Sequence, residues 1–112
     1  MKLKIGAIEY DVREVEDLHT TDEQGHKVAM HGAIYYDDTQ ISIERHQNAQ
    51  QKIATLWHEA VHGILNQAGH TDHEESHVIA LGYGLAALVR DNPDLVALTL
   101  GEAVIGDEQA SP

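Results

Sequence analysis

Residues 53–65 read IATLWHEAVHGIL, and this stretch decides the fold. Its apolar residues recur at intervals of three and four, as they do on one face of an α-helix. The apolar stripe comprises Ile53, Leu56, Ala60 and Ile64. His58 and His62 lie on a neighbouring side. We therefore predict a helix that begins near Asn48 and ends near Gly69, a residue type typical of helix ends.

The same stretch contains the motif HExxH at residues 58–62. Side chains four residues apart lie one turn above each other, so His58 and His62 can bind one metal ion. Glu59 is placed beside that ion, where it can take a proton from a bound water. The alternative interpretation is a chance motif with two solvated histidines, because the chain holds nine histidines.

A catalytic zinc site needs a third protein ligand and one open position for water. The candidates follow the first helix closely: His70, His73, Glu74, Glu75 and His77. Residues 71–74 have the pattern of a capping box, which would engage Glu74 with Thr71 at the start of the next helix. Glu75 is then the freer carboxylate. Glu74 and the histidines stay open as alternatives.

The residues before the motif show the two-residue alternation of β-strands. It is clearest at residues 2–5, 8–15 and 41–44, and residues 27–36 also carry strand-forming types, whereas 17–25 is polar and predicts a loop. We expect a small antiparallel sheet. Its edge is predicted at residues 41–44, where a peptide could bind by strand addition.

Two more helices are predicted after the motif. One spans residues 72 to about 90 and is apolar on nearly all sides, which is typical of a buried central helix. A short one spans residues 93 to about 100, with Asn92 as N-cap and Pro93 in the first turn. The predicted fold is α+β. One domain of residues 1–112 comprises a mainly β part (1–46), a mainly α part (47–105) and a polar tail (106–112).

Composition narrows the possible functions. The net charge of -12 disfavours binding to nucleic acid or to anionic membranes. The chain has no cysteine, which excludes disulfides and Cys-rich zinc sites. No apolar run approaches the length of a membrane span or a signal peptide, so we expect a cytoplasmic protein.

Several segments in the last two thirds of the chain, and a short part before them, resemble one protein family. They are residues 32–37, 41–43, 55–64, 74–75, 78–81 and 90–93. Together they resemble the minimal gluzincin-like metallopeptidases, that is the ImmA/IrrE-like proteins and their short phage and prophage relatives. The resemblance implies a zincin-like fold, in which a sheet packs on an HExxH helix and a following glutamate helix. It also implies zinc bound by His58, His62 and Glu75, with Glu59 as the base.

The predicted activity is zinc-dependent hydrolysis of a peptide bond, with a peptide or protein as substrate. Such a reaction usually needs one more hydrogen-bond donor for the oxyanion. The candidates by chemistry are Tyr35, Tyr36, His77 and Tyr83, while Trp57 fits the core better than a substrate contact. The alternative function is a non-catalytic interaction module, in which the metal stabilises the fold and a partner protein binds.

Overall fold

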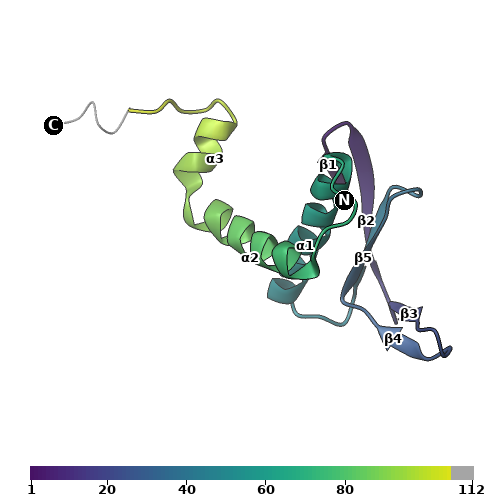
Figure 1. Cartoon of the computed structure of the whole chain (residues 1–112). Coiled ribbons are helices and arrows are strands. Elements are labelled where there is room, and N and C mark those ends of the chain that lie inside the picture. The colour runs from purple at the N-terminus through teal and green to yellow at the C-terminus, as the bar shows by residue number, and fades with distance from the viewer. Residues whose placement is uncertain (107–112) are drawn as a thin grey trace.

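The computed structural model describes residues 1–106 as an α+β fold of six strands followed by three helices (Figure 1). The strands are β1 (Lys2–Ile5), β2 (Ile8–Val15), β3 (His19–Thr21), β4 (Lys27–Ala29), β5 (Gly32–Tyr35) and β6 (Gln40–Glu44). The helices are α1 (Ala49–Gln67), α2 (Glu75–Asp91) and α3 (Pro93–Thr99). The α+β prediction is confirmed. The predicted tail lies outside the described residues except for Gly106.

The main sheet is mixed rather than antiparallel. Its strand order is β1-β2-β6-β5, and β2 and β6 run parallel. The sequence-based prediction was wrong because the chain leaves the sheet after β2 and forms a separate two-stranded ladder, β3–β4, partly within the predicted loop. It then returns through the antiparallel pair β5–β6. β6 is therefore an inner strand, and the predicted edge at residues 41–44 is wrong: β1 and β5 are the edges.

The core lies between this sheet and α1. It contains four buried residues, Ile5, Tyr10, Ile41 and Ile43, against which Leu56 and Ala60 of α1 pack. The predicted stripe is correct only in part, because Ile53 and Ile64 are 57% and 48% exposed. The buried residues of α1 are instead Thr55, Glu59 and Gly63, which follow one another at intervals of four on the flank beside that stripe, and Val61 on the other side of the helix. The helix is thus rotated so that the carboxylate of the motif faces inward.

The ends of α1 match their prediction, whereas the start of α2 does not. The Asn48 side chain caps α1 by accepting a hydrogen bond from the Gln51 amide at 2.8 Å, and Gly69 follows the helix with φ +90°. α2 begins only at Glu75, and its N-cap Glu74 makes no side-chain capping bond. The predicted capping box is therefore absent.

α2 is not the buried central helix that its composition predicts. Only Val78 and Gly82 of this helix are buried, because α2 leaves α1 at an angle and the sheet does not cover it (Figure 1). α3 packs on α2 and on no other described element. The resulting arm stretches the described molecule to 66 × 32 × 26 Å. None of the described helices is long and apolar enough to cross a bilayer.

Gly82 marks the closest approach of α2 to α1. A Cβ atom there would lie 3.3 Å from the Cα of His58 and 3.4 Å from its nitrogen, whereas nothing lies within 4 Å of a Cβ at Gly84. We predict that Gly82→Leu lowers the free energy of unfolding by about 1–3 kcal/mol through overpacking. Gly84→Leu is expected to leave it unchanged or slightly higher, because leucine favours helix over glycine.

Urea or thermal unfolding of the two variants beside the wild type measures this difference. Equal stability of Gly82→Leu and Gly84→Leu would contradict a close helix–helix contact at Gly82.

Candidate metal centre

Three of the predicted site residues converge where α1 meets the start of α2. The His58 Nε2 atom lies 2.5 Å from Glu75 Oε1, and His62 Nε2 lies 3.2 Å from Glu75 Oε2. One ligand atom from each residue lies within 4.8 Å of the others, so the group could hold a metal ion. The two imidazoles come from successive turns of α1, and the carboxylate comes from the first residue of α2.

The donor set and its spacing fit a small divalent cation. Metal–ligand bonds of about 2.1 Å in tetrahedral geometry place neighbouring ligand atoms about 3.4 Å apart. The distance from His62 to one oxygen of Glu75 is 3.2 Å, close to this value, whereas the distance of 2.5 Å from His58 to the other oxygen must lengthen by about 0.9 Å to admit the ion. Glu75 is free to make that shift because its side chain is 58% exposed.

The alternative ligands lie outside this group. The Glu74 side chain is 77% exposed and its carboxylate lies 3.9 Å from His77, so it faces away from the two motif histidines. His70 is exposed as well. His73 lies next to the centre, because its Nε2 atom is 2.7 Å from Nδ1 of His62. It contacts a candidate ligand without joining the three.

Glu59 is the most unusual ionisable group of the site. Only 6% of the residue is exposed, and burial, followed by the negative charge of Glu75, raises the pKa of its carboxyl from 4.5 to about 7. Burial also lowers the pKa of His62, although the Glu75 carboxylate opposes that shift. A carboxyl with a pKa near neutrality can both accept and return a proton at physiological pH.

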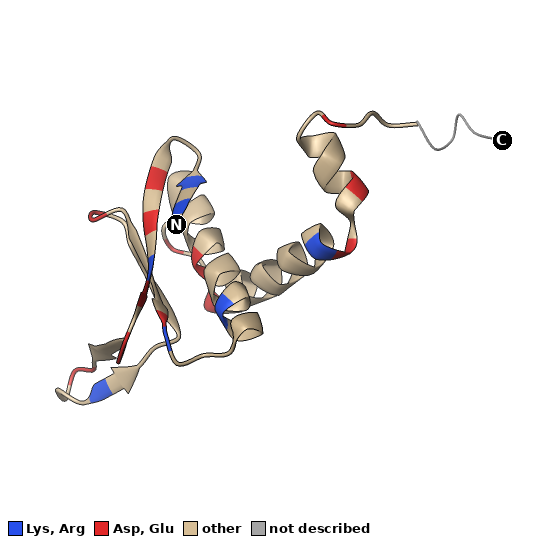
Figure 2. Cartoon of the chain, turned by 180° about the vertical axis from the view of Figure 1, so that it is seen from behind, with Lys and Arg blue, Asp and Glu red and all other residues tan. Residues whose placement is uncertain are grey.

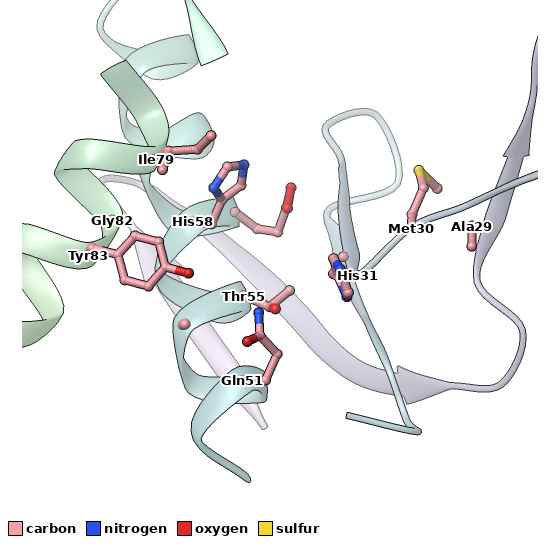
Figure 3. Close-up of a pocket in the computed structure, with 12 residues that line it drawn as sticks. Ala29, Met30, His31, Gln51, Thr55, His58, Ile79, Gly82 and Tyr83 are labelled. Atoms are coloured by element: carbon pink, nitrogen blue, oxygen red, sulfur yellow. The ribbon is translucent and has the colours of Figure 1, made fainter. Parts of the chain in front are cut away.

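A cleft of about 420 Å³ opens beside His58 and Glu59. Figure 3 shows His58 and Tyr83 on one side of it and Met30 and His31 opposite. Sequence reasoning missed Met30 and His31, because no local pattern signals that the segment between β4 and β5 faces the helices.

The cleft wall is tightest at Gly32, the first residue of β5. A Cβ there would lie 2.4 Å from Thr55 Cγ2 and 3.3 Å from Glu59 Oε2. The absence of a side chain therefore lets the backbone of β5 approach the predicted base closely. The sequence shows that a glycine stands at position 32, but it does not show that this glycine lies against Thr55 and Glu59.

Of the four tyrosine and histidine candidates for oxyanion stabilisation, only Tyr83 lines this cleft. The Tyr36 hydroxyl lies 3.4 Å from the backbone carbonyl of His62, to which it donates a hydrogen bond. Tyr35 is 39% exposed on the edge strand, and His77 lines a different hollow with Leu81. Trp57 is half-buried, as expected of a packing residue.

Comparison with known proteins adds no relative: no protein-family model, curated protein or solved structure matches the chain.

We predict that Glu59→Gln stabilises the metal-free protein in a pH-dependent way. The folded state holds the Glu59 proton more tightly than the unfolded chain, so the wild type loses stability as the pH rises from 4.5 to about 7. The loss amounts to about 3 kcal/mol, and glutamine does not incur it. In chelator, the two proteins should unfold at similar temperatures near pH 4.5, and the variant several degrees higher at pH 8.

Thermal unfolding of both proteins across this pH range is the measurement, with the exposed Glu102→Gln as the control. A difference between Glu59→Gln and the wild type that does not change with pH would contradict the buried carboxyl.

Proposed function

We propose that the chain is a zinc-dependent peptidase of the HExxH type, similar to the ImmA/IrrE-like metallopeptidases. The observation that carries the proposal is the meeting of His58, His62 and Glu75 beside a buried Glu59 and an open cleft. Two imidazoles and one carboxylate form the ligand set of many catalytic zinc sites, and they leave one position for water. A chance HExxH motif gives no reason for a carboxylate from a second helix to meet both histidines.

When bound, zinc acidifies a water molecule and polarises the substrate carbonyl. The residues of the chain then supply orientation and proton transfer. The Glu59 carboxylate accepts the proton of the attacking water and delivers it to the leaving amine. Burial raises the pKa of this carboxyl to about 7 in the metal-free protein, and a bound zinc ion would lower it again. The Tyr83 hydroxyl is the donor we assign to the oxyanion.

The substrate we propose is an extended peptide that adds to the edge strand β5. The amide of Glu44 donates to the carbonyl of His31 at 2.8 Å, just before the β5–β6 ladder. In an antiparallel register that continues from this pair, Gly32 and Ile34 direct their backbone groups away from β6. A peptide backbone can pair with them, and Gly32 adjoins Glu59.

The charge of the cleft favours neutral or basic peptides. Its lining contains the carboxylate of Glu59 and no lysine or arginine. Figure 2 shows the basic residues on the main sheet, on the β3–β4 ladder, near the start of α1 and at the end of α2. A net charge of -12 adds a long-range attraction for basic segments, which salt screens.

The alternative is a metal-stabilised interaction module without turnover. The observation that favours it is the number of exposed apolar side chains on the arm: Ile79, Leu81, Leu88, Val89, Leu95 and Leu100. A partner protein that covered these side chains would remove apolar surface from water. The two functions share the metal and differ in whether Glu59 is needed.

We predict that the purified protein binds about one zinc per chain and that His58→Ala and Glu75→Gln abolish or strongly weaken this binding. Glu74→Gln changes the adjacent carboxylate, which faces away from the centre, and should retain the metal. Metal analysis after dialysis against a weak chelator measures the content. Equal zinc loss in Glu74→Gln and Glu75→Gln would contradict the assigned ligand set.

For the reaction, we predict that Glu59→Gln retains zinc and loses peptide hydrolysis by at least about a hundredfold, as expected for removal of a general base. Mixtures of unstructured peptides, analysed by mass spectrometry, provide the assay. Zinc binding without cleavage by the wild type would overturn the peptidase and favour the interaction module.

A further inference from the structure

The second ring nitrogen of His62 has a partner of its own. The Nε2 atom of His62 faces Glu75, whereas its Nδ1 atom lies 2.7 Å from Nε2 of His73. The two ring centroids are 5.0 Å apart, and His73 is half-buried in the segment between α1 and α2. His62 therefore bridges the candidate metal position and a residue that is not among the three ligands.

The direction of the hydrogen bond between His62 and His73 follows from the partner of the other ring nitrogen of His73. The Nδ1 atom of His73 lies within hydrogen-bond distance of the backbone carbonyl of His70, and a carbonyl can only accept. His73 must therefore carry its proton on Nδ1. When His73 is neutral its other nitrogen is an acceptor, so His62 donates from Nδ1 and, with a metal ion bound, directs the lone pair of Nε2 at the ion. This assignment applies to the metal-bound state, since without the ion Nε2 of His62 lies 3.2 Å from the Glu75 carboxylate, which can only accept.

The end of α1 fixes the position of His70, whose backbone carbonyl accepts the hydrogen bond from His73. The amide of His70 donates to the carbonyl of Leu65 at 2.8 Å, and the amide of Gly69 donates to that of Asn66 at 3.1 Å. This pair of bonds, with Gly69 at φ +90°, is the Schellman arrangement of a helix end. The helix that carries His62 thus also fixes the position of His70.

We propose that His73 is a positioning residue, which fixes the His62 tautomer with its Nε2 lone pair directed at the metal. The inference rests on the proposed metal site. Metal-binding histidines commonly donate their other ring N–H to a neighbouring acceptor, which orients the ring and raises its basicity. His73 supplies that acceptor here, and the carbonyl of His70 determines that it accepts.

The first test compares zinc affinity by competition with a chromophoric chelator. His73→Ala is expected to bind zinc about 10–100-fold more weakly than the wild type. His73→Gln should recover most of the affinity, because its amide oxygen can accept from His62. His77→Ala, which removes an exposed histidine four residues away, should bind as the wild type does. Circular dichroism of each variant reports whether it folds.

The second measurement is the tautomer itself, from long-range proton–nitrogen correlation spectra of the zinc-loaded, nitrogen-15-labelled wild type. We expect His62 protonated at Nδ1 and metal-bound at Nε2, with His73 neutral and protonated at Nδ1. A His62 bound through Nδ1, or a His73 protonated on both nitrogens, would overturn the inference.

The outcomes separate this inference from the proposed function. A wild type that takes up no zinc overturns both. A wild type that binds zinc, together with a His73→Ala variant that binds it equally tightly, overturns only the role of His73. Weak binding by His73→Ala that His73→Gln does not improve would assign His73 a packing role instead.

Discussion

The candidate site depends on the close contact between α1 and α2 at Gly82. The backbone of His58 lies against Gly82, so any side chain there would separate the helices at a motif histidine. Glu75 precedes Gly82 by seven residues, which is about two helical turns, and therefore shares its face. Val78, between them, is fully buried. The contact at Gly82 thus places the Glu75 carboxylate next to both imidazoles.

A buried carboxylate is the second constraint, and it acts against stability. Glu59 faces the sheet side of α1 next to the backbone of Gly32, where water solvates it poorly. A helix selected only for packing would place an apolar residue there. The chain instead has a carboxyl at this position, and burial raises its pKa to about 7. Local rules are most often broken in this way where a residue serves chemistry.

The sequence predicted the features that local patterns determine. The spacing of His58 and His62 and the end of α1 at Gly69 follow from helical periodicity and backbone preference, and the structure agrees with both. Glu75 was preferred because a capping box would engage Glu74 and because the family resemblance implied it. The capping box is absent, so only the contact of α2 with α1 shows why Glu75 faces the two histidines.

Most failures of sequence-based prediction concern non-local arrangement; the absent capping box at residues 71–74 is a local one. Residues 41–44 were predicted as the edge of the sheet, whereas pairing with β2 on one side and β5 on the other makes β6 an inner strand. The apolar composition of α2 predicted that this helix is buried. That prediction failed because the periodicity of a sequence cannot show that the sheet does not extend over the helix. The capping pattern at residues 71–74 also gave the wrong start for α2. Hydrogen bonds join the residues just before this segment to the end of α1, and His73 within it contacts His62.

The arm explains why a metal would matter to the fold as well as to chemistry. α2 has one neighbour of substance, α1, and leaves much of its apolar surface to solvent. An ion held by two side chains of α1 and one of α2 would connect the helices at the end where α2 begins, beyond the Gly82 contact. Its binding energy would stabilise only the folded arrangement. α2 contacts α1 and α3 but no strand among the described elements, so such a connection would hold its start more effectively than that of a helix packed on several elements.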